Sequence, residues 1–138
     1  MGSMVARVRR QNPFIFTLAL RAQDAAVVLA RDLVAMAFDE WELAEISYDG
    51  RIVISELVTN AVRACKPDGD ITVRVYLEEG DPVLEVWDES PLLPEFQVAG
   101  VDDIRGRGLF IVRSLVKDLV VLRVSGAPGK VVRAVMSR

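Results

Sequence analysis

The stretch "ISELVTNAVRAC", residues 54–65, combines the pattern of a buried helix with polar groups that such a helix does not need for folding. Apolar residues recur in it at intervals of three and four: Ile54, Leu57, Val58, Ala61 and Val62. This spacing predicts a helix that packs one stripe against a sheet. The helix should cover at least the second half of residues 39–65, a stretch in which Gly50 is a weak point, and should end near "CKPDGD" (65–70), where proline and glycine mark a turn.

Two polar residues of this helix, Glu56 and Asn60, could carry chemistry. Glu56 and Asn60 are four residues apart, so their side chains lie on one helix face about one turn apart. A glutamate can accept a proton or orient a hydroxyl, and an asparagine oxygen is a neutral, hard ligand for magnesium. Arg63 follows three residues later. Taken alone, an ordinary Glu/Asn pair on a solvated helix edge is the simpler explanation.

The segments on either side predict an α+β domain. In order, we expect a strand (14–20), a helix (25–38), the helix around 54–65, a hairpin (71–77 with 83–88), a helix from 106, and a second hairpin (120–126 with 130–137). Asp24 is a plausible N-cap of the first helix. Because the strands follow each other as hairpins, the expected fold is a two-layer α/β sandwich. Its sheet would be mixed and mostly antiparallel, with the helices on one face.

The domain organisation predicted from the sequence is simple. Residues 1–4 resemble an expression scar, residues 5–13 are polar and basic and should form a flexible arm, and residues 14–138 form one domain. Residues 89–105 have no periodicity and should form a long loop.

Composition excludes several functional classes. The formal net charge is −3, which argues against direct binding of nucleic acid. A single cysteine, Cys65, and no histidine make a zinc or iron site unlikely and fit a reducing cytoplasm. A histidine-activated serine or cysteine nucleophile is impossible. No apolar run approaches the roughly 18 residues of a membrane span, so we expect a cytoplasmic protein without membrane contact.

A glycine motif stands at the start of the helix expected from 106. Gly106 and Gly108 flank Arg107, and Arg105 precedes them. Glycine lets the backbone approach a ligand, and a helix N-terminus offers free N–H groups to phosphate. The motif is neither a Walker loop nor a complete dinucleotide fingerprint. A plain entry from loop to helix is the alternative.

Asp88 ends the strand 83–88 and faces the long loop. A buried carboxylate there could accept a hydrogen bond from an exocyclic amine such as that of adenine. The alternative is an aspartate that shapes a turn at the end of a strand.

Together and in this order, the three motifs resemble those of the Bergerat-fold (GHKL) ATPases. The likeness is closest to the small anti-sigma factor serine protein kinases of actinobacteria and their single-domain relatives. "SELVTNAV" (55–62) is similar to their N box, "GRGLFIV" (106–112) to the second glycine box and "VWDESP" (86–91) to the first in outline. Gly129-Lys130 before the last strand is also typical. The resemblance spans residues 14–138.

The resemblance implies a role for each matching residue. Glu56 would be the general base, Asn60 would hold Mg²⁺ and through it the phosphates of ATP, and Asp88 would bind the adenine amino group. Residues 95–105 would form a lid. The nucleotide-binding set implied is Asn60, Arg63, Asp88, Arg105, Gly106, Arg107, Gly108 and Leu109.

The chain departs from the family pattern in four places. Ser90 and Leu92 stand where the first box often has glycine. Val131 is the nearest counterpart of a threonine found beside the adenine-binding aspartate, and Ala64 replaces a frequent histidine. The phosphate and metal end of the site is therefore expected to be better preserved than the base end.

The function implied is that of an ATP-binding anti-sigma factor. It would phosphorylate a serine of an antagonist (anti-anti-sigma) protein with Mg-ATP and control a sigma factor by partner switching. The alternative is a non-catalytic interaction module of the same fold with weak or no nucleotide binding. The ATPase half of a histidine kinase fits poorly, because the chain has no histidine. The resemblance also implies a homodimer through a sheet face, to which Phe14, Phe16 and Leu18 would contribute.

Overall fold

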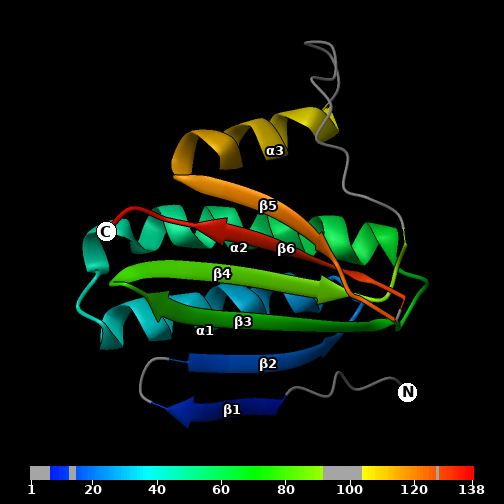
Figure 1. Cartoon of the computed structure of the whole chain (residues 1–138), viewed down its shortest axis with the longest axis horizontal. Coiled ribbons are helices and arrows are strands. Elements are labelled where there is room, and N and C mark those ends of the chain that lie inside the picture. Colours follow the sequence, from blue (N-terminus) through cyan, green and yellow to red (C-terminus); the bar gives the residue numbers. More distant parts are fainter. Residues whose placement is uncertain (1–6, 13–14, 92–103, 127) are drawn as a thin grey trace.

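The fold is a two-layer sandwich in which two long helices cover one face of a sheet (Figure 1). The computed structural model describes residues 7–12, 15–91, 104–126 and 128–138, and of 7–12 and 104–109 the backbone alone. The elements are β1 (Arg7–Asn12), β2 (Ile15–Arg21), α1 (Ala25–Glu40), α2 (Ala44–Ala64), β3 (Asp70–Glu78), β4 (Asp81–Asp88), α3 (Ile104–Leu115), β5 (Asp118–Arg123) and β6 (Lys130–Val135). The predicted α+β sandwich is confirmed.

The sheet places the end of β4 beside the start of β6. Within the described residues it has six strands in the order β1-β2-β3-β4-β6-β5, and each neighbouring pair is antiparallel. The expectation of a mixed sheet was therefore wrong on this point. Because β6 runs antiparallel to β4, Lys130 lies directly opposite Asp88, and Val131 lies opposite Trp87.

The segment expected to be a flexible arm contains an edge strand. Arg7–Asn12 forms β1 and pairs antiparallel with β2. Residues 5, 6 and 13 of the expected arm lie outside the described residues. The basic composition "RVRRQN" concealed the strand, since charged residues are common on edge strands, where they discourage pairing with other chains.

The main core lies between the sheet and the helices α1 and α2. Phe16 and Leu18 of β2 are buried in it, and the Phe16 ring lies 5.8 Å from that of Trp41. Both residues thus face the helices, which corrects the expectation that they contribute to a dimer through a sheet face. Phe14 lies outside the described residues.

Gly50 is a contact point between the two long helices. A Cβ placed on it would lie 2.7 Å from Cε2 of Phe38 and 3.2 Å from Cγ1 of Val34. A side chain there would collide with α1, because real Cβ atoms do not approach so closely. Gly50 is therefore no weak point: its low helix propensity is outweighed by the close packing that it allows.

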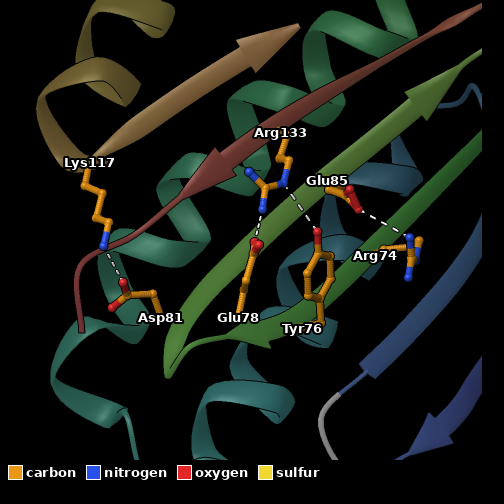
Figure 2. Close-up of polar contacts among 7 residues, drawn as sticks. All are labelled: Arg74, Tyr76, Glu78, Asp81, Glu85, Lys117 and Arg133. Atoms are coloured by element: carbon orange, nitrogen blue, oxygen red, sulfur yellow. Dashed lines mark hydrogen bonds and ion pairs between the residues drawn. The ribbon is translucent and has the colours of Figure 1, made fainter. Parts of the chain in front are cut away.

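The face of the sheet opposite the helices carries a polar network (Figure 2). Arg74 of β3 pairs with Glu85 of β4 at 3.4 Å, and Arg133 of β6 pairs with Glu78. The Arg133 Nε also donates to the Tyr76 hydroxyl at 3.4 Å. These contacts link strands β3, β4 and β6 across their exposed side.

Two predicted helix starts need correction. Asp24 precedes α1 as expected, but its own backbone is helical and its side chain makes no capping hydrogen bond. The helix α3 begins at Ile104, so the Gly106–Gly108 motif lies inside it and not ahead of it. No helix within the described ranges is long and apolar enough to cross a membrane.

Candidate functional site

Glu56 and Asn60 lie on a flank of α2, beside its buried stripe. The buried residues of the helix are Gly50, Val53, Ile54, Leu57, Val58 and Ala61. Glu56 and Asn60 are each half-buried, and no hydrogen bond or ion pair joins either side chain to another residue of the described part of the chain. Their oxygens thus remain available as acceptors on one face, as a general base and a metal ligand require. Arg63, in the last turn of α2, is exposed.

The glycine motif forms the first turns of α3. Arg105, Gly106, Arg107, Gly108 and Leu109 all follow Ile104, where the helix begins. Tertiary packing explains why a glycine-containing segment is helical: α3 packs against α2 and Val112 is fully buried in the main core. The N–H groups of the first four helical residues, 104–107, have no partner within the helix, so the motif keeps an arrangement that suits phosphate.

Asp88 ends β4 on the side of the sheet that faces the helices. It shares this face with Leu84 and Val86 and is only 1% exposed. Its Oδ1 accepts a hydrogen bond from the backbone N–H of Ser90 at 2.9 Å. Asp88 is thus buried, as the binding of an exocyclic amine would require, and its hydrogen bond from Ser90 also shapes the bend after the strand, as the structural alternative expected.

Lys130 is a partner of Asp88 that sequence reasoning missed. Its Nζ lies 2.8 Å from Asp88 Oδ1 and 3.4 Å from the backbone oxygen of Ser90, and the lysine is 2% exposed. The signal was present in the alternation of β6, because Lys130 falls in phase with the buried residues Val132 and Ala134. A lysine at a buried strand position requires an acidic partner.

Gly129 holds the start of β6 close to the end of β4. Its φ is +116°, and a Cβ there would lie 2.5 Å from the backbone oxygen of Asp88 and 3.0 Å from Nε1 of Trp87. Only glycine adopts this conformation at little cost and leaves room for so close an approach. Glycine thus allows the close backbone approach next to the position at which Lys130 meets Asp88.

Cys65, the residue that follows the last residue of α2, lies close to Asp88, Glu89 and Lys130. Burial raises the pKa of its thiol, the Asp88 and Glu89 carboxylates raise the pKa further, and a backbone hydrogen bond from Glu89 and the charge of Lys130 lower it. Glu89 Oε1 is buried without a hydrogen-bond partner among the described residues. These contacts place the end of the α2 helix, which carries Glu56 and Asn60, beside the Asp88–Lys130 pair.

The two ends of the site fit a nucleotide unequally. The described residues hold no group of three or more His, Cys, Asp or Glu that could bind a metal by itself. A magnesium ion at Asn60 would take its other ligands from phosphate and water, which is its usual mode of binding. This end fits Mg²⁺ and phosphate. At the other end, the Oδ1 atom of Asp88 is already engaged by Lys130 and Ser90.

Comparison with known proteins places most of the chain in one family. The model of the histidine kinase-like ATPase domain matches residues 20–136, which include α1, α2, α3 and the strands β3 to β6. A search among curated proteins gives no significant match.

Proposed function

The chain belongs to the histidine kinase-like ATPase domain family, and from this membership we propose that it binds ATP and transfers phosphate to a serine of a partner protein. The observation that carries the proposal is the placement of Glu56 and Asn60 on one flank of α2, with their oxygens unused by other described residues. The helix α3, whose first turns hold the glycine motif, packs against that same helix.

Each group has a role in such a transfer. Mg-ATP, when bound, supplies the phosphoryl group. Asn60 would hold the metal through its amide oxygen, and the first-turn amides of α3 would hold the phosphates. Glu56 would accept the proton of the serine hydroxyl. Phosphoryl transfer depends mainly on positioning and charge neutralisation, so this small set of groups is sufficient in kind.

We also propose that the reaction serves partner switching. The similarity of "SELVTNAV" and "GRGLFIV" to the boxes of anti-sigma factor kinases supports a protein that holds either a sigma factor or an antagonist. Phosphorylation of the antagonist would decide which of the two is bound.

The reaction is tested by comparing the unmodified protein with Glu56→Gln on purified candidate antagonists in the presence of Mg-ATP. The substitution keeps the size of the side chain and removes its basicity. We expect phosphoserine on the antagonist with the unmodified protein only, while both proteins bind ATP equally. Phosphorylation by Glu56→Gln at an undiminished rate would refute the assigned role.

A second candidate is a non-catalytic module that binds partners through the same fold. The Asp88–Lys130 pair favours it, since the Asp88 carboxylate, which was expected to bind the adenine base, is already paired within the protein. Absence of any nucleotide binding by the unmodified protein would support this candidate over the kinase.

A further inference from the structure

The Asp88–Lys130 pair engages one of the two carboxylate oxygens of Asp88. Asp88 Oδ1 receives two donors, the Lys130 Nζ at 2.8 Å and the Ser90 N–H at 2.9 Å. A carboxylate oxygen has about two acceptor positions, so these donors fill the capacity of Oδ1, and a base could reach the carboxylate only through Oδ2. Lys130 also reaches the backbone oxygen of Ser90, which ties the ammonium to the turn after β4 as well as to the carboxylate.

The pair is also shielded and held in place by the backbone. Asp88 and Lys130 are 1% and 2% exposed, and Ser90 is 6% exposed. The pairing of β4 with β6 sets Lys130 opposite Asp88, and the Gly129 backbone lies too close to Asp88 to leave room for a side chain. Separating two buried opposite charges is costly because neither would find an equivalent partner. A neutral amine of a base is a poor replacement for the ammonium of Lys130.

We propose that Asp88 serves as the buried counter-ion of Lys130 and does not read the base, so that the site accepts nucleoside triphosphates through phosphate and metal with little regard to the base. This inference rests on the proposed nucleotide-binding function. It makes Lys130 the residue that keeps Asp88 from selecting the base.

Matched ligands give the expected magnitudes. ATP and ITP differ at position 6 of the purine, which carries an amine in ATP and an oxygen in ITP, and at the neighbouring N1, which carries a proton only in ITP. A site built to hydrogen-bond one group rejects the other because its own polar atoms are left unpaired. Here Asp88 stays paired with Lys130 whichever base is present, so that penalty does not arise. We expect the affinities for ATP and ITP to agree within about threefold.

Variants separate the roles of the two charges. Asp88→Leu with Lys130→Met replaces the pair by apolar groups of similar size, and we expect its affinities for ATP and ITP to stay within about threefold of those of the unmodified protein. Lys130→Met alone frees the carboxylate, and where this variant folds it should prefer ATP over ITP by about tenfold or more. Lys117→Met is the matched control: Lys117 is also ion-paired, but with Asp81 at the opposite end of β4.

The experiment is calorimetric titration of the full chain with ATP and ITP in excess Mg²⁺, with circular dichroism to verify folding. Equal binding of the two nucleotides by the unmodified protein and by the double variant supports the inference. Tenfold tighter binding of ATP than ITP by the unmodified protein, or tenfold loss of ATP affinity in the double variant, overturns it and leaves the proposed function standing. Absence of binding to both nucleotides overturns the proposed function and this inference with it.

Discussion

Removing the charge of Lys130 should destabilise the protein strongly. In Lys130→Met the apolar stem of the side chain is largely kept, but the Asp88 carboxylate loses its ion-pair partner at 2.8 Å. Both side chains are almost fully buried, at 3% and 2% exposure, so water cannot replace the lost ammonium. Breaking a buried pair from one side costs about 3–5 kcal/mol, because an uncompensated charge stays inside.

The structure favours the lower part of that range. Asp88 Oδ1 keeps its hydrogen bond from the Ser90 N–H, which offsets part of the loss. We therefore expect the free energy of unfolding to fall by about 3 kcal/mol. With an m value of about 1.5 kcal/mol/M, the midpoint of urea unfolding should fall by roughly 2 M.

The assay is urea unfolding followed by circular dichroism, with two comparison variants. Lys117→Met removes a lysine from an exposed ion pair with Asp81 and should leave the midpoint nearly unchanged. Asp88→Leu with Lys130→Met should recover most of the loss, since a buried pair can often be replaced by apolar groups. A midpoint for Lys130→Met equal to that of Lys117→Met would refute the reasoning.

Three further changes test the packing and the electrostatics of the same region. Gly50→Ala should lower the unfolding free energy by about 0–2 kcal/mol, because a gain of about 1 kcal/mol in helix propensity is set against an overpacking cost of about 1–3 kcal/mol at Phe38. Adding Phe38→Leu should recover the loss. A Gly50→Ala variant more stable than the unmodified protein would contradict the contact. Gly129→Ala should cost about 1–3 kcal/mol or more in thermal unfolding, and clearly more than Gly126→Ala, whose φ is also positive but which has no atom within 4 Å of the added Cβ; equal losses would argue against the close approach. Because burial and the neighbouring carboxylates raise the pKa of the Cys65 thiol, its alkylation by iodoacetamide should be slower at neutral pH than that of a free thiol, with a rate that rises at a higher pH; a pH midpoint at or below that of the free thiol would contradict this.

Periodic burial made the layers of the fold predictable. Ile54, Leu57 and Val58 recur at helical spacing and are buried in α2, and Leu84 and Val86 alternate in β4 and are buried on the helix side. Burial of apolar surface dominates such elements, so pattern alone identifies them. The same pattern placed Glu56 and Asn60 beside the buried stripe and Asp88 at the end of a buried row.

Features that depend on contacts between distant residues could not be predicted in this way. The strand β1 is stabilised by backbone pairing with β2, to which its basic composition gives no clue. The role of Gly50 depends on Phe38 of another helix, and that of Lys130 depends on the β4–β6 pairing. The start of α3 at Ile104 reflects tertiary packing that overrides the low helix propensity of Gly106 and Gly108.

The most direct test of nucleotide binding at the α2 flank is calorimetric titration of Mg-ATP into the unmodified protein, Asn60→Ala and Ser55→Ala. Ser55 is a suitable control on the same helix, because its hydroxyl donates to the Arg51 backbone oxygen at 2.6 Å. Saturable binding that requires Mg²⁺, is lost in Asn60→Ala and persists in Ser55→Ala is the expected result. Binding of equal strength in Asn60→Ala and in the unmodified protein would contradict the account.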